Sequence, residues 1–547
     1  MEFFQTNHMH LYIAIFLSVL NGALLAFLST KFLQVLQQAG YKMKGYITWL
    51  RGTRYKYLSR LFTLALLSGF CALVTNTLLD VYHKETLFSY IGLVFYFYFA
   101  AVFIINLVKE PNKVPLVKTK RIGRLFGLLF LIYSGLTFIL IALSTEFLLL
   151  LRFGIITLTP ILVPFVVMFG FYLILPLELL INAVYVFKAK RKLKKMPHLL
   201  KIGITGSFAK TSNKFILEKM LSKKYKTLSS PHSYNTPLGL TRVILQQLNP
   251  SYEVFIAELG AKKVGEIKEL CQFIKPHHGI LTSIGTQHLE TFKTQENIAK
   301  TKFELADYIK NGFMIFNGDS AKCLEMFNKE DNPNRLLSFG SENKSGDAYC
   351  ENVVCDENGT IFTLVLGDKK INCQTKLLGK HVCQNIAMCA LLSFNLGVSV
   401  KDIKAAISEL EAPKHRLEIV ASSPELIVID DSFNASVEGA KASLEVLGLF
   451  KDFKKVIITP GIVEMGKLET DANFNFGKEI AKVCDWAIVV NEINKAALQN
   501  GMLENGMKEE NILYCENLAQ ANEKLKALEL DKAVVLFEND LPDLFAY

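Results

Sequence analysis

Lys210 and Thr211 stand where an apolar run turns into a predicted helix, and both side chains suit the handling of phosphate. Residues 201–212 read Lys-Ile-Gly-Ile-Thr-Gly-Ser-Phe-Ala-Lys-Thr-Ser, a short strand and then a turn of small residues, with a helix expected over 213–221. Backbone N–H groups at a helix N-terminus attract anions, a lysine neutralises phosphate, and a threonine hydroxyl can reach Mg²⁺. The segment therefore predicts a nucleotide phosphate loop.

Three further side chains have the chemistry of a metal site beside bound phosphates, provided that the fold brings them together. Glu258 ends an apolar run, His288 follows another, and Lys302 lies in a segment with helical character. Taken singly, each has a simpler interpretation: a solvated glutamate at a strand end, a structural histidine, and a solvated lysine on a helix face. Only their combination with Lys210 favours a Mg²⁺-dependent phosphate site.

The elements that must position these residues occupy only part of the chain. Its 547 residues are 51% hydrophobic with a mean hydropathy of +0.27, which is high for a soluble enzyme. The excess lies in residues 1–187, whereas residues 197–547 read as ordinary globular sequence. This length and contrast predict three domains: a transmembrane domain at 1–196, a central ATP-binding domain at 197–414, and a C-terminal domain at 415–547.

Long apolar runs in the first third predict an N-terminal α-helical transmembrane region of about five spans. The positive-inside rule places the basic clusters beside these runs in the cytoplasm, with the N-terminus outside and the C-terminal half inside. Arg152 and the prolines of the last run leave a re-entrant piece or a sixth span open. The spans are expected near 11–36, 61–82, 87–108, 125–143 and 153–187. The clusters are Lys42, Lys44, Arg51, Arg54, Lys56 and Arg60; Lys109, Lys113, Lys118, Lys120, Arg121 and Arg124; and Lys188, Lys190, Arg191, Lys192, Lys194 and Lys195.

The charge and the cysteines exclude several classes of protein. The net charge of +10 comes from clusters at the ends of apolar runs, which is normal topology chemistry and argues against nucleic-acid binding. No acidic or histidine residue stands in mid-span in a pattern that suggests ion transport, so a membrane anchor or docking surface is favoured over a transporter. The ten cysteines are scattered without a C-x-x-C pair, which indicates free thiols in a reducing compartment.

Short motifs follow one another after residue 197 in an order that resembles the Mur ligase family. Residues 206–211 resemble its T-G-x-x-G-K-T loop, with Ala209 in place of the last glycine. Residues 231–242 resemble the family's N-x-x-x-G-x-x-x-T loop, 255–261 its strand with a Mg²⁺-binding glutamate, and 284–290 its segment with the metal-site histidine. Residues 298–304 resemble the segment with the carbamylated lysine, 316–319 the N-x-D stretch, and 379–385 the G-x-H-N-x-x-N motif near the adenine. Residues 415–418 and 429–435 complete the set. The resemblance covers about residues 197–547.

This resemblance implies roles for individual residues. Lys210 would hold the β- and γ-phosphates, and Thr211 with Glu258 would ligate one Mg²⁺. His288 and Glu258, with a carbamylated Lys302, would hold or orient a second Mg²⁺, and a carbamate suits this ion better than an amine does. The implied ATP-binding residues are Gly206, Ser207, Phe208, Ala209, Lys210, Thr211, Ser212, Asn317, His381, Asn385, Arg416 and Asp431, and the implied substrate-binding residues are Asn235, Thr236 and Asn434.

Apolar strands alternate with helical stretches after residue 415, which predicts a small Rossmann-like α/β domain. By resemblance it closes over ATP and brings the amine substrate, with Arg416 on the γ-phosphate and Asp431 on the ribose. Residues 431–435 look most like D-S-Y-N-A-N-P of the members that add D-alanyl-D-alanine, whereas 536–543 depart from the usual K-G-S. We expect strands at 426–429, 455–459, 486–490 and 533–537 and helices at 437–449 and 471–483.

The resemblance implies an enzyme, an ATP- and Mg²⁺-dependent ligase that makes an amide through an acyl phosphate in peptidoglycan precursor synthesis. It implies UDP-N-acetylmuramoyl-tripeptide and D-alanyl-D-alanine as substrates, and a multi-pass protein of the inner bacterial membrane with cytoplasmic catalytic domains. The sequence offers no N-terminal domain to grip the UDP-sugar, so a lipid-linked or polymeric carboxylate, such as poly-γ-glutamate, is an alternative. A transporter or scaffold with an ATP-binding domain is a further alternative, against which the Mg²⁺ constellation argues.

Overall fold

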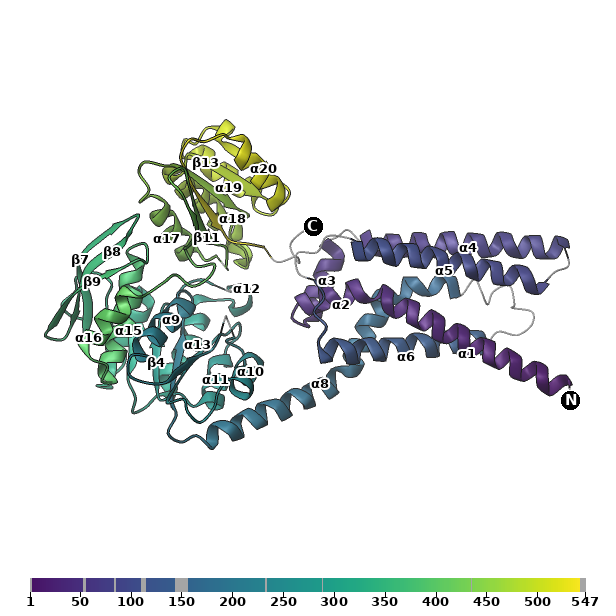
Figure 1. Cartoon of the computed structure of the whole chain (residues 1–547), viewed down its shortest axis with the longest axis horizontal. Coiled ribbons are helices and arrows are strands. Elements are labelled where there is room, and N and C mark those ends of the chain that lie inside the picture. The colour runs from purple at the N-terminus through teal and green to yellow at the C-terminus, as the bar shows by residue number, and fades with distance from the viewer. Residues whose placement is uncertain are drawn as a thin grey trace. The chain divides into compact units, whose positions relative to one another are not determined.

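The computed structural model describes residues 2–52, 56–82, 85–109, 115–142, 156–231, 234–287, 289–433 and 435–541. The chain divides into two compact units, Met1–Asn182 with Leu541–Tyr547, and Ala183–Asp540. The described elements of the first unit are helical, and the second unit carries two β-sheets (Figure 1).

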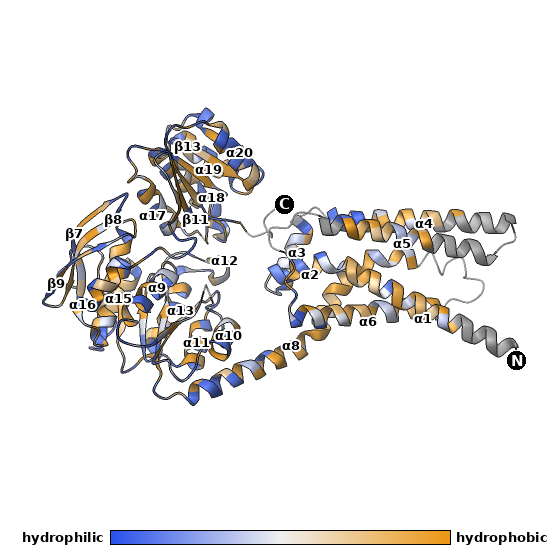
Figure 2. Ribbon diagram, viewed as in Figure 1, coloured by the Kyte–Doolittle hydropathy of each residue, from blue (hydrophilic) through white to orange (hydrophobic). Residues whose placement is uncertain are grey.

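Helices make up the described elements of the first unit, as its apolar runs predict. A helix satisfies its own backbone hydrogen bonds, which is what an apolar segment needs in order to lie in lipid. Figure 2 shows apolar residues along α1, α6 and α8. The helices are α1 (Glu2–Leu28), α2 (Thr30–Gln38), α3 (Met43–Gly52), α4 (Lys56–Tyr82), α5 (Glu85–Lys109), α6 (Lys120–Ala142), the 3₁₀ turn Thr159–Leu162, and α8 (Val163–Lys194), which continues into the second unit.

Three segments of the described chain are long and apolar enough to cross a membrane: Leu11–Gln38, Lys120–Ile141 and Ile156–Lys194. Two other predicted spans coincide with α4 and α5, which are 27 and 25 residues long, and α5 contains the shorter apolar segment Val94–Asn106. The count of five spans stays a prediction. From Val163 onward the last apolar run is one helix of 32 residues with Pro176 inside it, so this part contains no re-entrant turn.

One acidic side chain lies inside the last apolar helix. Glu178 in α8 is only 1% exposed. Its two carboxylate oxygens accept hydrogen bonds from Arg124 of α6 at 2.6 and 2.8 Å, and Arg121 lies 3.8 Å away. A buried charge is tolerated when it is paired and hydrogen-bonded. Glu178 therefore links α8 to α6.

The larger sheet of the second unit has nine strands in the order β2-β3-β1-β4-β5-β6-β7-β8-β9. Neighbours from β2 to β7 are parallel, and β8 and β9 are added antiparallel. The carboxyl ends of the parallel strands meet at one edge, where such sheets bind ligands. The strands are β1 (Leu200–Thr205), β2 (Thr227–Ser229), β3 (Val254–Glu258), β4 (His278–Leu281), β5 (Met314–Asn317), β6 (Arg335–Ser338), β7 (Ala348–Asp356), β8 (Gly359–Leu366) and β9 (Lys369–Thr375).

Helices cover both faces of this sheet because alternate strand residues point to opposite faces. In β3, Val254 and Ile256 pack with α9, α15 and α16, whereas Phe255 and Ala257 pack with α10, α11, α13 and the end of α8. Both faces are therefore buried, as expected for a parallel sheet. The helices are α9 (Lys210–Leu221), α10 (Pro237–Gln246), α11 (Glu266–Ile274), α12 (Leu289–Phe292), α13 (Gln295–Tyr308), α14 (Ala321–Phe327), α15 (His381–Asn395) and α16 (Val400–Ser408).

The smaller sheet has six strands in the order β10-β11-β15-β12-β13-β14, parallel except for β10. The strands and helices predicted after residue 415 are confirmed, and β10, β14, α19 and α20 are additional. The elements are β10 (Glu418–Ser422), β11 (Leu426–Asp431), α17 (Val437–Leu447), β12 (Lys454–Thr459), α18 (Glu469–Val483), β13 (Trp486–Val490), α19 (Lys495–Glu504), β14 (Ile512–Cys515), α20 (Leu518–Ala527) and β15 (Ala533–Glu538). The domain boundaries at 196 and 414 stay predictions.

Candidate functional site

The predicted phosphate loop connects β1 to α9. Gly206 has φ +153°, and a Cβ there would collide with Thr282 and the backbone of Ser283, so glycine is required. Ala209 has φ +60°, a left-handed conformation that strains any residue with a Cβ. The Phe208 N–H donates to Ser283 Oγ at 2.8 Å, which fixes the loop on the end of β4. The loop is thus held close to β4 at the cost of strain at one alanine.

Lys210 begins α9 and curls back over the loop. Its Nζ donates to Gly206 O at 2.8 Å and to Ser207 O at 3.1 Å. Burial lowers the pKa of Lys210 to about 8, the charge of Glu258 opposes this shift, and the charge of Arg416 adds to it. A partly buried cation that donates to carbonyl oxygens suits an anionic ligand, because a phosphate would supply the charge that the loop lacks.

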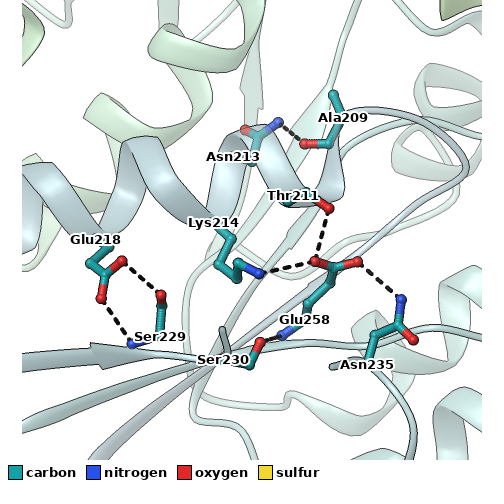
Figure 3. A network of polar contacts seen from close by, with 9 residues as sticks. All are labelled: Ala209, Thr211, Asn213, Lys214, Glu218, Ser229, Ser230, Asn235 and Glu258. Atoms are coloured by element: carbon teal, nitrogen blue, oxygen red, sulfur yellow. Dashed lines mark hydrogen bonds and ion pairs between the residues drawn. The ribbon is translucent and has the colours of Figure 1, made fainter. Parts of the chain in front are cut away.

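Glu258 is the centre of the polar network drawn in Figure 3 and is 1% exposed. Its Oε2 accepts a hydrogen bond from Thr211 Oγ1 at 3.0 Å and lies 3.4 Å from Lys214 Nζ. Its Oε1 accepts from Asn235 Nδ2 at 3.1 Å. The carboxylate and the threonine hydroxyl therefore present neighbouring oxygen atoms, which is the donor set that Mg²⁺ prefers. The predicted pairing of Thr211 with Glu258 is present in the fold.

Lys302 lies on α13 and is 4% exposed. Its Nζ is 6.0 Å from the centre of the Phe292 ring. Burial lowers the pKa of Lys302 to about 7, and the charge of Lys210 lowers it further. The charges of Glu266, Glu258 and Glu304 oppose this shift. Since only a neutral amine reacts with CO₂, these surroundings fit the carbamylation that the sequence resemblance implies. The simpler interpretation, a solvated lysine, is wrong.

Two predicted site residues, His288 and Asn434, lie outside the residues that the structure describes. The two substrate-binding candidates that it does describe have structural partners. Asn235 binds Glu258, and Thr236 caps α10 by accepting a hydrogen bond from Gly239 N at 3.3 Å. Pro237 at the first helical position completes a normal helix start.

A cavity of about 520 Å³ lies beside the phosphate loop. It is lined by five predicted nucleotide-binding residues, and Asp319, Lys380 and Gln384 extend it beyond the prediction. Burial lowers the pKa of His381 to about 4, so its ring is neutral at physiological pH, and it packs edge-on against Phe208 at 6.4 Å. The predicted residues in the lining are Phe208, Ala209, Asn317, His381 and Asn385.

Hydrogen bonds fix two amides of this cavity. Asn317 donates to Thr282 O at 2.6 Å and accepts from Asp319 N at 2.8 Å. Asn385 Oδ1 accepts from Asn213 Nδ2 at 2.7 Å. A largely apolar cavity with fixed amides next to a phosphate loop has the polarity that an adenine needs.

Arg416 and Asp431 belong to the part that carries the smaller sheet. Arg416 lies 4.8 Å from the centre of the Phe433 ring. Burial lowers its pKa, and the charges of Asp431, Glu258 and Glu538 oppose the shift. Asp431 ends β11 and accepts a hydrogen bond from Leu417 N at 3.3 Å. The negative charges of carboxylates from both sheets of the second unit therefore act on Arg416.

Comparison with known proteins agrees with this arrangement. Residues 204–393 match the family model described as the Mur ligase middle domain. This part of the chain is a Mur ligase middle domain. It contains the phosphate loop, Glu258, Lys302 and the cavity of about 520 Å³.

Curated relatives named UDP-N-acetylmuramoyl-tripeptide–D-alanyl-D-alanine ligase match beyond this domain. The Buchnera aphidicola protein (from Acyrthosiphon pisum) is 29% identical over 267 residues, 49% of this chain and 58% of the relative. The Escherichia coli protein is 28% identical over 48% of this chain and 58% of the relative. The Bacillus subtilis protein is 25% identical over 61% of this chain and 75% of the relative. The chain thus spans less than two thirds of the length of the first two.

Solved structures share the fold of the second unit. A structure of MurF from Acinetobacter baumannii has a TM-score of 0.59 at 23% identity and covers 67% of this chain and 78% of that one. MurF from Thermotoga maritima in complex with ADP has a TM-score of 0.58 at 24% identity, with 66% and 80% covered. The α/β fold predicted for residues 197–547 is confirmed by these similarities.

Besides Asp319, Lys380 and Gln384, Lys214 is a residue at the site that the sequence did not predict. It is 0% exposed and pairs with Glu258. Burial lowers its pKa, and Glu258 opposes that shift by charge and by hydrogen bonding. A signal existed in the sequence: Lys214 follows Lys210 by four residues and lies on the same face of the helix. In the middle domain, one carboxylate is thus surrounded by cations and donors.

Proposed function

We propose that the chain is an ATP-dependent ligase that joins a carboxylate to an amine through an acyl phosphate. The observation that carries this is the convergence of Lys210, Thr211, Glu258 and Lys302 beside the cavity, within a Mur ligase middle domain. Transfer of phosphate to a carboxylate brings several anions together, so positive charge and positioning supply most of the catalysis. Buried lysines at the end of a sheet meet that need.

In this mechanism Lys210 holds the β- and γ-phosphates of ATP, and Arg416 contacts the γ-phosphate. Two Mg²⁺ ions would neutralise the phosphates: Thr211 and Glu258 would hold one, and Glu258, His288 and carbamylated Lys302 would hold or orient the second. The substrate carboxylate attacks the γ-phosphorus and displaces ADP. The amine then attacks the acyl carbon, and inorganic phosphate leaves.

We further propose UDP-N-acetylmuramoyl-tripeptide as the carboxylate and D-alanyl-D-alanine as the amine, the substrates in the names of the relatives. A second cavity, of about 320 Å³, has a lining that suits a small zwitterion, which supports this choice of amine. Its apolar lining includes Ile462 and Phe476, with Lys441 to meet a carboxylate and Asp471 and Glu479 to meet an ammonium group. A dipeptide carries these two charges at its ends.

A second candidate substrate is a lipid-linked carboxylate. It is favoured by the elements described before residue 195, which are all helices and include three that are apolar enough to cross a membrane. We propose that this unit embeds the protein in the membrane with the catalytic unit in the cytoplasm. Confinement of enzyme and acceptor to one membrane would raise their effective concentration.

Phosphate release tests the function. The full chain in detergent is given ATP, Mg²⁺, UDP-N-acetylmuramoyl-tripeptide and D-alanyl-D-alanine, and each is omitted in turn. We expect release only with the complete mixture, together with a product heavier by one dipeptide. Release that needs neither acceptor nor amine contradicts the ligase. If release needs a lipid-linked acceptor instead of the UDP-sugar, the second candidate replaces the first.

A further inference from the structure

The ends of β11 and β15 bring together two carboxyl groups that the proposed mechanism does not use as a pair. The strands are parallel neighbours, and their register sets Asp431 beside Glu538. Glu538 is 1% exposed, and the two side chains are in hydrogen-bond contact. Two buried carboxylates repel each other strongly, whereas one proton between them converts the repulsion into a hydrogen bond.

The hydrogen-bond donors and the positive charge around these two carboxyl groups are too few to stabilise two full negative charges. The Ser443 hydroxyl of α17 lies against Asp431 Oδ2 and also 2.9 Å from Gly439 O. Among the described residues, Glu538 Oε2 has no hydrogen-bond partner, although it is buried. The cation that acts on both carboxyl groups is Arg416. In the part of the chain that the structure describes, one positive charge therefore faces two acids, and a single proton restores the balance.

The electrostatics agree with this geometry. Burial raises the pKa of Glu538 well above its usual value, and the charge of Asp431 adds to the rise. A hydrogen bond with Ser443 and the charge of Arg416 oppose it. Burial also raises the pKa of Asp431, against Ser443, Arg416 and the Leu417 amide. Both directions favour retention of a proton.

We propose that Asp431 and Glu538 share one proton and form a carboxyl pair with a single negative charge, which positions Arg416 toward a bound phosphate. The proposal rests on the proposed function, in which Arg416 contacts the γ-phosphate of ATP. Glu538 acts as a positioning residue, since it works through Asp431 and Arg416. It lies in the segment 536–543 that departs from the family's K-G-S. Loss of the shared proton would add a second negative charge beside Arg416 and weaken its attraction for phosphate.

Calorimetric titration of the full chain in detergent with ATP and Mg²⁺, from about pH 6 to about pH 9, tests this. In Glu538→Gln, the side-chain amide still donates a hydrogen bond to Asp431, and it does not lose a proton at alkaline pH. Lys210 and Lys302 titrate in the same range in both proteins, so the readout is the ratio of the wild-type Kd to the E538Q Kd. We expect this ratio to rise about tenfold toward alkaline pH, as one extra charge several ångströms away requires.

Two further variants fix the interpretation. Glu538→Ala removes the donor and should weaken ATP binding at every pH, whereas the exposed Glu523→Gln of the same sheet's α20 should follow the wild type. A ratio that stays constant with pH overturns the proposal. Failure of the wild type to bind ATP overturns the proposed function instead. Infrared spectra separate these failures without ATP: a protonated carboxyl band at neutral pH should vanish in E538Q, and its persistence contradicts the shared proton.

Discussion

The larger and smaller sheets of the second unit each bury a glutamate at the carboxyl end of a parallel strand, yet the two glutamates have opposite surroundings. Glu258 and Glu538 are both 1% exposed. Glu258 has Lys214, Thr211 and Asn235 around it, so its charge is matched locally. Glu538 faces Asp431 and has an oxygen without a partner within the described structure.

The difference shows that burial alone does not determine what a carboxyl group does. A carboxylate among cations can offer its oxygens to a metal ion or a phosphate-bound cation, whereas a carboxyl beside another acid tends to keep a proton. In the proposed mechanism, the middle domain therefore supplies charge to the reaction, and the carboxyl pair of the smaller sheet positions Arg416. Variants that change a single member of each group test this contrast.

Removal of the phosphate-loop cation should have the largest effect. We expect Lys210→Ala to lower phosphate release by about a thousandfold or more, because transition-state charge loses its main neutralising group. Lys219→Ala on the same helix is the matched control, since its pair with Glu409 is exposed and contributes little. Near-normal turnover in K210A would remove the phosphate-loop assignment.

Removal of the cation beside Glu258 should lower stability more than any change at Glu538. Lys214→Met leaves a buried carboxylate without its ion-pair partner, which costs about 3–5 kcal/mol, whereas Glu538→Gln should cost about 1 kcal/mol or less. Denaturant midpoints of the two variants measure the difference. The double variant Lys214→Met with Glu258→Gln should regain much of the loss, and equal midpoints for K214M and the wild type would break the comparison.

Loss of the buried lysine of α13 should be repairable. Lys302→Ala should reduce turnover about a hundredfold or more, and added short carboxylates should restore part of it by replacing the carbamate. The exposed Lys300→Ala should behave as the wild type. In the wild type, CO₂-dependent activity should rise with pH through about 7, because the neutral amine of Lys302 gains population. Absence of rescue and of this dependence would count against a carbamate.

The smallest change concerns backbone strain. Ala209→Gly should stabilise the protein by about 0.5–1 kcal/mol, because relief of the strain at φ +60° outweighs the extra entropy that glycine loses on folding. Ala442→Gly, inside α17, should destabilise by about 1 kcal/mol. Thermal unfolding of the two variants in detergent should give shifts of opposite sign.

Sequence patterns were sufficient to predict some of the elements and the residues close to a motif. The phosphate loop, the strand ending in Glu258, and the strands and helices predicted after residue 415 follow from local periodicity and turn residues. Lys214 and Glu538 could not be assigned in this way, because their roles depend on partners 44 and 107 residues away in the chain, Glu258 and Asp431. The sequence places Glu178 in an apolar run, but only packing reveals Arg124 as its partner.

The central claim is that the carboxylate is activated by phosphorylation. Its most direct test uses UDP-N-acetylmuramoyl-tripeptide labelled with ¹⁸O in the reacting carboxylate, with ATP, Mg²⁺ and D-alanyl-D-alanine, and mass analysis of the released phosphate. The acyl phosphate route predicts that one labelled oxygen moves into each phosphate, because the bond broken by the amine is the one between the acyl carbon and that oxygen. Phosphate that is released without label would mean that water attacks ATP, and the ligase account would be wrong.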